Sequence, residues 1–133
     1  MRFIERLLNQ GNAPLIEQAV RFSAARHKLL AENIANVSTP GYRQKDLSVD
    51  NFRAMLRSRV AERNSAPPGS ANMDVTFEPN DATGGVIFHD RGNRSMEQLM
   101  TDSVSNALYH NMMLEMLRKQ YSSIEAALKE RVS

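Results

Sequence analysis

The stretch L-L-A-E-N-I-A-N-V-S-T-P-G-Y, residues 29–42, predicts the end of an amphipathic helix followed at once by a sharp turn. Pro40 has no amide hydrogen and restricts Thr39 to extended conformations, while Gly41 accepts the positive φ of a Pro-Gly type II turn. The helix should therefore end by about Ser38.

Two asparagines lie just before this turn. Asn33 and Asn36 are three residues apart, so they occupy neighbouring positions on one helical face. Each side-chain amide can both donate and accept hydrogen bonds. We expect such a pair to fasten a loop or a neighbouring chain.

The helix that ends here is predicted to begin near Pro14, because proline is tolerated in the first helical turn. A shorter amphipathic helix is predicted over residues 2–9. The longer helix carries two apolar stripes, one made of Ile16, Ala19, Val20, Leu30 and Ile34 and the other of Leu15, Phe22, Ala25 and Leu29. Two apolar faces indicate two sets of neighbours, either inside a helical bundle or in an assembly.

A second long helix is predicted from Ser95 to the C-terminus, with Arg94 or Ser95 as its cap. No proline or glycine occurs in residues 94–133, and such a helix would be about 55 Å long. Its apolar seam is spaced alternately by four and three residues: Met96, Met100, Ser103, Ala107, His110, Leu114, Leu117, Tyr121, Ile124 and Leu128. A helix of this length needs a partner, and the helix ending near Asn36 can lie antiparallel to it.

Polar residues interrupt both seams. Ser103 and His110 lie on one helix, and Ser23 and His27 lie on the other. Polar seam positions cost stability but can fix the register of a helix pair. The alternative is that they are tolerated near a solvated edge.

The middle of the chain differs in kind. An apolar cluster at residues 47–56 predicts a docked loop or a brief helix beginning near Asp50, a plausible cap. Residues 57–94 are rich in proline, glycine and arginine and hold two short apolar runs, 74–78 and 86–89. We interpret this part as a loop-rich segment that is either disordered or forms a small β structure.

The predicted fold is therefore mainly α, a long antiparallel helical hairpin or coiled coil formed by the N- and C-terminal helices. Its regions are residues 1–56, which include the turn, 57–94, the flexible middle, and 95–133, the long C-terminal helix, within one domain. The chain has 133 residues, of which 41% are apolar and 6% aromatic. Its core should be thin, and oligomerisation would complete the burial.

Composition excludes several classes of function. A formal net charge of +2 without a dense Lys/Arg run argues against nucleic-acid binding, and no stretch is long and apolar enough for membrane insertion. There is no cysteine. We expect no catalytic residues, no cofactor and no metal. Two alternatives remain open at this point: a cytoplasmic helical-hairpin adaptor or chaperone, and a small metal-dependent enzyme using His27, His89 and His110.

The turn and its asparagines carry a resemblance to a known family. The axial proteins of the bacterial flagellum have an Asn-x-x-Asn-x-x-Thr-Pro-Gly-Tyr/Phe signature, and the chain reads Asn33, Ile34, Asn36, Thr39, Pro40, Gly41 and Tyr42 there. Residues 26–30 and 106–108 also match, so the chain most resembles the short proximal-rod subunits of the flagellar basal-body rod protein family. Arg94, Leu99 and His110 differ from that pattern.

The resemblance implies a structural rod subunit that transmits torque and is not an enzyme. Its implied partners are other flagellar rod and basal-body proteins, copies of itself and the flagellar type III export apparatus. Its implied location is the basal-body rod that spans the periplasm, reached without a cleaved signal peptide. Assembly would use the helical seams, namely Ile16, Val20, Leu30 and Ile34 of the first helix and Met96, Met100, Ala107, His110, Leu114, Leu117, Tyr121, Ile124 and Leu128 of the second.

Overall fold

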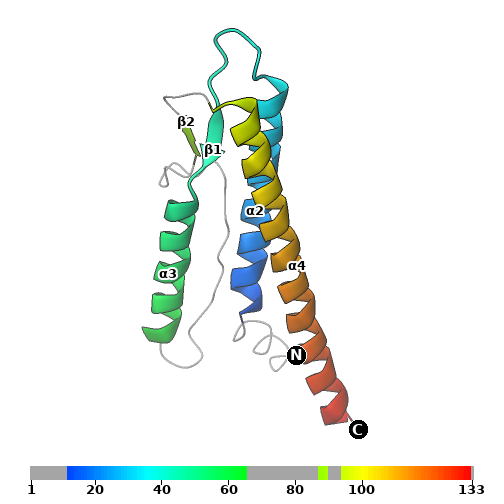
Figure 1. Ribbon diagram of the computed structural model, residues 1–133. Helices are drawn as coiled ribbons and strands as arrows, with labels where there is room; N and C mark the ends of the chain where they lie inside the picture. Colours follow the sequence, from blue (N-terminus) through cyan, green and yellow to red (C-terminus); the bar gives the residue numbers. More distant parts are fainter. Residues whose placement is uncertain (1–11, 66–86, 90–93, 133) are drawn as a thin grey trace.

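The protein is a helical hairpin with a third helix beside it (Figure 1). The structure, a computed structural model, describes residues 12–65, 87–89 and 94–132. In chain order its elements are α2 (Ala13–Ala35), β1 (Lys45–Leu47), α3 (Val49–Ser65), β2 (Ile87–His89) and α4 (Met96–Val132). Helices α2 and α4 run antiparallel and form the most extensive contact between elements. The predicted fold class is confirmed, whereas the helix predicted over residues 2–9 lies outside the described residues.

Helix α2 begins and ends as its sequence predicts. Pro14 lies in its first turn, and its last residue is Ala35. The turn that follows closes with a hydrogen bond from the Tyr42 amide to the Thr39 carbonyl oxygen, at 3.2 Å. Gly41 has φ 76°, the left-handed conformation that the third position of a type II turn requires. The Pro-Gly turn is therefore confirmed.

Helix α4 is 37 residues long, which corresponds to about 55 Å. Ser95 caps it through a reciprocal capping box. The Gln98 amide donates to Ser95 Oγ at 3.3 Å, and the Ser95 amide donates to Gln98 Oε1 at 3.0 Å. Of the two caps considered from the sequence, Ser95 is thus the one that the structure uses.

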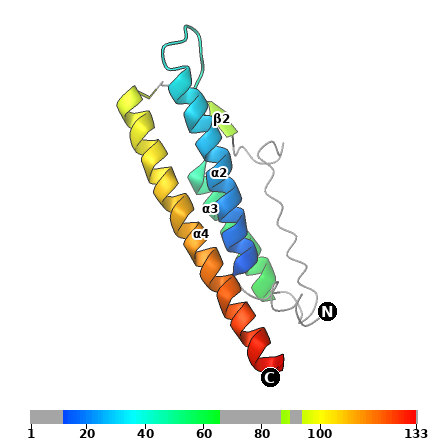
Figure 2. The same cartoon turned by 90° about the vertical axis from the view of Figure 1, so that its right-hand side faces the viewer.

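The second apolar face of α2 packs against β1 and the start of α3. Phe22 of that face and Ala19 of the first stripe meet Leu47 of β1 and Phe52 of α3 in one buried cluster, and half-buried Tyr109 and Met113 of α4 pack against it. The rings of Phe22 and Phe52 are stacked, with centroids 4.1 Å apart and planes inclined by 12°. The two faces of α2 therefore have two sets of neighbours within the same chain, α4 on one side and β1 with α3 on the other (Figure 2).

Helix α3 differs from the prediction in its cap and its length. Ser48, not Asp50, caps it, because Ser48 Oγ accepts the Asn51 amide at 3.2 Å, and Asp50 lies in the first turn. The helix continues to Ser65, so residues 57–65 are helical and not part of a loop. Arginine, alanine and glutamate in this stretch are good helix formers, and the first proline comes only at residue 67.

The small β structure predicted for the middle segment is present. Strands β1 and β2 pair antiparallel, with Lys45 opposite His89, Asp46 opposite Phe88 and Leu47 opposite Ile87. The apolar run at 74–78 lies outside the described residues. The pairing ties residues 87–89 to the segment that directly follows the turn.

The face of α4 that packs against α2 is offset from the predicted seam. Leu99 is fully buried and Asn106 is 3% exposed, and both lie outside that seam. Three of the six residues in this face are polar, so its apolar periodicity is not visible in the sequence. Its members, spaced alternately by four and three residues, are Leu99, Ser103, Asn106, His110, Met113 and Leu117. Of the predicted seam, His110, Leu114, Leu117, Ile124 and Leu128 are half-buried, whereas Met96, Met100, Ala107 and Tyr121 are exposed.

We predict that replacing Phe52 by alanine lowers the free energy of unfolding by about 3 kcal/mol, because the change leaves a cavity beside Phe22. Urea titration followed by circular dichroism measures the loss. Amide hydrogen exchange should show that α3 loses protection before α2 does. In the control, Met112→Ala on the exposed side of α4 should cost less than about 0.5 kcal/mol; equal losses in the two variants would contradict the packing described here.

Candidate functional site

Asn33 holds the chain that returns from the turn. Its side chain is 1% exposed. Its Nδ2 donates to the Lys45 carbonyl oxygen at 2.7 Å, and its Oδ1 accepts the Lys45 amide at 3.0 Å. The side-chain amide thus pairs with Lys45 as a neighbouring strand would. Of the two asparagines expected to fasten a loop or a neighbouring chain, Asn33 thus holds the loop of its own chain.

The other polar residues of the motif build and orient the turn. Asn36 Nδ2 donates to the Glu32 carbonyl oxygen at 2.9 Å, and Thr39 Oγ1 donates to Asn36 Oδ1 at 3.2 Å, so both stabilise the end of α2. The Tyr42 hydroxyl donates to Asn33 Oδ1 at 3.3 Å. Burial and, secondarily, the nearby Glu32 carboxylate raise the pKa of the Tyr42 phenol. Tyr42 therefore keeps the proton that it donates.

The remaining motif residues have less enclosed positions. Pro40 and Gly41 are exposed at the tip of the turn, and Ile34 is half-buried on α2. Of the first-helix seam, Ile16 and Leu30 are buried and Val20 is half-buried. The motif thus serves the fold of this chain through Asn33, while its tip faces solvent.

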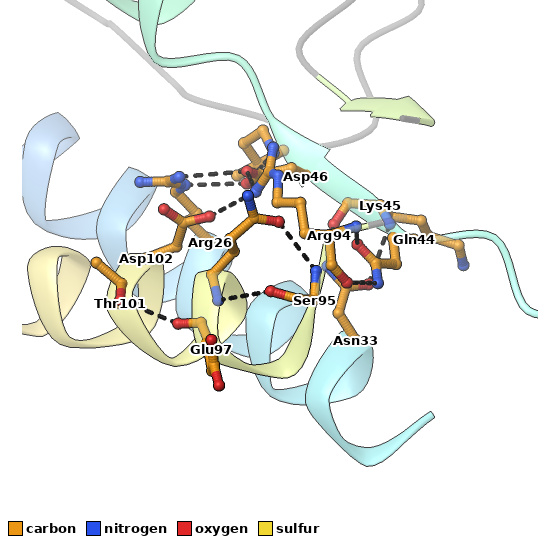
Figure 3. A network of polar contacts seen from close by, with 12 residues as sticks. Arg26, Asn33, Gln44, Lys45, Asp46, Arg94, Ser95, Glu97, Thr101 and Asp102 are labelled. Atoms are coloured by element: carbon orange, nitrogen blue, oxygen red, sulfur yellow. Dashed lines mark hydrogen bonds and ion pairs between the residues drawn. The ribbon is translucent and has the colours of Figure 1, made fainter. Parts of the chain in front are cut away.

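Gln44 makes a second clamp of the same kind (Figure 3). Its side chain is buried, its Oε1 accepts the Arg94 amide at 2.9 Å, and its Nε2 donates to the Arg94 carbonyl oxygen at 3.0 Å. Arg94 directly precedes Ser95, the cap of α4. Two amide side chains therefore hold β1 in place. Asn33 connects it to the end of α2, and Gln44, the residue before β1, connects it to the start of α4.

Asp46 lies between these clamps and joins three elements through charge. Its carboxylate receives two hydrogen bonds from Arg26 of α2, at 2.9 and 3.2 Å, and one from Arg94, at 2.8 Å. The Leu47 amide donates to it at 2.7 Å. Arg94 also reaches Asp102 of α4 at 2.9 Å, so the network continues along the helix (Figure 3).

The charge state of Asp46 follows from these contacts. Burial by itself raises the pKa of the carboxyl group, but the hydrogen bonds from Arg26 and Arg94, the charge of Arg26 and the Leu47 amide outweigh it. The pKa of Asp46 is therefore below its ordinary value, and the carboxylate is ionised in the folded protein at neutral pH. A buried carboxylate with two guanidinium partners is strongly destabilised when a partner is lost.

A second polar cluster fixes α2 against α4 further along the hairpin. Asn106 Nδ2 donates to the Ser23 carbonyl oxygen at 2.8 Å, and Ser23 Oγ lies 2.6 Å from His110 Nδ1. Ser23 Oγ also donates to the Val20 carbonyl oxygen at 2.9 Å, and which atom donates in the Ser23–His110 pair depends on the tautomer of the imidazole. These contacts specify one alignment of the two helices, as the polar seam positions predict. Ser103 is half-buried beside them, and His27 is exposed.

The histidines do not form a metal centre in the described part of the chain. His110 is engaged with Ser23, and His27 lies exposed on α2. Within residues 12–65, 87–89 and 94–132, no group of three or more His, Asp or Glu side chains could hold a metal ion. None of the helices described combines the length and apolar character needed to cross a membrane.

Sequence comparison finds two curated relatives, which are the same kind of protein from two bacteria. The chain is 23% identical over 128 residues to the flagellar basal body rod protein FlgB of Bacillus subtilis, covering 91% of this chain and 95% of the relative. The chain is FlgB-like. The flagellar basal body rod protein FlgB of Aquifex aeolicus is 24% identical over 134 residues, covering 88% of this chain and 92% of the relative. No protein-family model and no solved structure matches.

These similarities confirm the resemblance to flagellar rod proteins that the Asn33-to-Tyr42 motif predicts. Both relatives are described as rod proteins and not as enzymes. The FlgB-like character extends over nearly the whole chain, so it includes α3 and α4 as well as the motif.

Sequence reasoning missed three buried polar residues, Gln44 and Asp46 at β1 and Asn106 of the second polar cluster. The available signal was indirect. Gln44 and Asp46 are two residues apart, a spacing that places both on one face where the chain is extended. The partners of these side chains in other parts of the fold, Arg26, Arg94 and Ser23, lie 20 to 83 residues away in the sequence, and no local pattern specifies such a distance.

We predict that Asn33→Ala lowers the free energy of unfolding by about 2–3 kcal/mol, because the Lys45 amide and carbonyl both lose a buried partner. The matched variant Asn36→Ala removes an exposed cap and should cost about 1 kcal/mol or less. Chemical denaturation of the two purified variants measures the difference. If the two losses were equal, the clamp function of Asn33 would be disproved.

We also predict that Asp46 makes folding sensitive to acid. The pKa of Asp46 is lower in the folded than in the unfolded state. The stabilisation that its carboxylate provides is therefore complete above the unfolded-state pKa of about 4, and it is lost as the pH falls through the folded-state pKa. Asp46→Asn should therefore be less stable than the parent at pH 7, and the difference should shrink below about pH 4. Thermal melts from pH 7 to pH 2.5 test this. The control Phe52→Ala keeps the carboxylate, so it should be destabilised by a similar amount across the series.

Proposed function

We propose that this chain is a structural subunit of the bacterial flagellar basal-body rod. The observation that carries the proposal is its similarity to two FlgB rod proteins, which spans about nine tenths of each molecule. The helical hairpin and the Asn33-to-Tyr42 turn described above are consistent with a load-bearing role. Its partners in this role are other rod and basal-body proteins together with copies of itself.

Assembly would use the outer side of α4. Large apolar side chains are exposed there, among them Val104 at 61%, Leu108 at 66% and Met112 at 54%. Apolar side chains gathered on one exposed face mark interaction surfaces more often than isolated ones do. Methionine adapts to neighbours of different shape, as contacts with several kinds of rod subunit would demand. The exposure of Met96, Met100, Ala107 and Tyr121 supports their assignment to contacts between subunits.

The polar junction would give the subunit its stiffness. Asn33, Gln44 and Asp46 connect the end of α2, the strand and the start of α4 by directed hydrogen bonds. Sliding one helix past the other would break several of these at once. A subunit held in this way is suited to passing torque along a rod without changing its own shape.

The route to the rod is part of the same proposal. A rod that spans the periplasm is built outside the cytoplasm, so the subunit would leave through the flagellar type III export apparatus without a cleaved signal peptide. This step rests on the similarity to the rod proteins and on the motif they share with the axial family.

We predict that deleting the gene abolishes swimming while growth stays normal, and that the intact gene restores it. Leu108→Glu should fail to restore swimming, because it places a charge on the outer face of α4, whereas Leu108→Met should succeed. Soft-agar motility and electron microscopy of basal bodies are the measurements. Circular dichroism should show that Leu108→Glu is folded, since Leu108 is exposed. A deletion strain that swims normally would exclude the rod function.

A further inference from the structure

We propose that the outer face of α4 in one copy binds the outer face of α3 in a second copy of this chain. The inference deepens the proposed function and rests on it, because it names the two surfaces that meet in the assembly. It is carried by opposite charge on the two faces and by their placement on different sides of one subunit.

The outer face of α4 is apolar at its centre and acidic at both ends. Glu97 and Glu115 are 18 residues apart, which is five helical turns, so they lie on one line about 27 Å apart. Val104 and Leu108 lie between them along that line, and all four residues are exposed. Residues 95–117 contain three acidic residues and no lysine or arginine. Glu115 does pair with Arg118 at 2.6 Å, but this is an exposed pair of small worth.

The outer face of α3 has the opposite character. Helix α3 contains four arginines and two acidic residues. Ala54, Arg57 and Ala61 are exposed and share one side of the helix by their spacing. Exposed Arg53 lies at the edge of this side, near Tyr109 of α4, where its charge opposes the rise that burial causes in the pKa of the phenol. The two alanines leave shallow positions beside the arginines. Large side chains from a facing helix could fit there, with the guanidinium groups near acidic residues of that helix.

Helix α3 is available for such a contact. Phe52 is its only fully buried residue among those described, and half-buried Val49, Met55 and Leu56 pack against the same cluster, so its attachment to the rest of the chain lies in its first two turns. The helix runs down the flank of the molecule beside α2, on the side opposite α4 (Figure 1). An exposed helix with a regular basic side is a surface that a second molecule can cover.

The two faces cannot meet within one molecule. Helix α3 lies beside β1 and α2, and α4 lies on the other side of the subunit, as Figures 1 and 2 both show. The contact therefore joins unlike surfaces of two copies. Contacts between unlike surfaces leave one free face of each kind at the ends, so they propagate to further copies and do not close as a two-fold dimer does.

Burial and charge have different tasks in this interface. Covering Met100, Val104, Leu108 and Met112 removes apolar surface from water, which supplies most of the affinity. The exposed ion pairs contribute little each, but they orient the encounter and disfavour pairing of two α4 faces, both of which are acidic. The arrangement selects α3 as the occupant over a second α4.

The test uses the full-length chain, which has no cysteine of its own. Ala54→Cys, Ala61→Cys and Leu108→Cys are made singly, and Ala54→Cys is also combined with Leu108→Cys. Purified variants are treated at high protein concentration with a short bis-maleimide, which links nearby thiols and tolerates small errors of register. We expect the mixture of an α3 variant with the α4 variant to give a linked dimer, and the double variant to give a ladder of higher products.

Two controls make the outcome specific. Lys28→Cys, exposed on α2, should give at least fivefold less product with Leu108→Cys than Ala54→Cys does. Arg57→Glu in the α3 partner should lower the yield several-fold, and 0.5 M salt should lower the rate of linkage, because ionic strength screens the steering charges. A homodimer of Leu108→Cys as the main product would overturn the proposal in favour of an α4–α4 contact. Yields no higher than those of the Lys28→Cys control would overturn it outright.

This outcome is separable from that of the rod function. Swimming of the deletion strain tests the function, and cross-linking of the purified chain tests the contact. A non-motile deletion strain together with absent α3–α4 linkage would leave the rod function in place and reject this interface. Linkage in a chain whose deletion has no effect on swimming would show self-association outside the rod.

Discussion

The ion pairs of Asp46 are the constraint on which the arrangement of the other elements depends. A carboxylate that is almost fully buried must be paired, and Asp46 takes one guanidinium from α2 and one from the residue before the cap of α4. Its position therefore fixes the strand, the end of one helix and the start of the other relative to each other. The stacked rings of Phe22 and Phe52 attach α3 to α2.

Side-chain amides supply the hydrogen bonds to the backbone at this junction that further strands would supply in a larger sheet. Asn33 and Gln44 each offer one donor and one acceptor to the backbone of a single residue, Lys45 and Arg94 respectively. Two three-residue strands could not hold this junction alone, because a short isolated ribbon is marginally stable in water. With these clamps the hairpin is rigid at one end, and the apolar outer face of α4 remains exposed for contacts with other molecules.

Arg94, Leu99 and His110 are the three positions that differ from the pattern of the family that the chain resembles. Each has a defined partner or site between the helices: Arg94 binds Asp46, Leu99 is fully buried, and His110 meets Ser23. Their differences thus concern the inside of the hairpin. The turn motif and the exposed apolar side of α4, which carry the resemblance and the proposed assembly, are unaffected by them.

The mainly α class, the two long helices and the Pro-Gly turn could be predicted from the amino-acid sequence, because they depend on helical periodicity and on backbone restrictions that act within a few residues. For Asn33 and Asn36 the sequence left open whether they fasten a loop or a neighbouring chain. Only the tertiary structure decided that α4 turns Leu99 and Asn106 inward while Met96 and Met100 face outward, since two series with the same spacing fit one helix. It also decided the partners of Gln44 and Asp46. Such pairings join residues far apart in the chain, and they are set by how the elements pack in space, which no local pattern records.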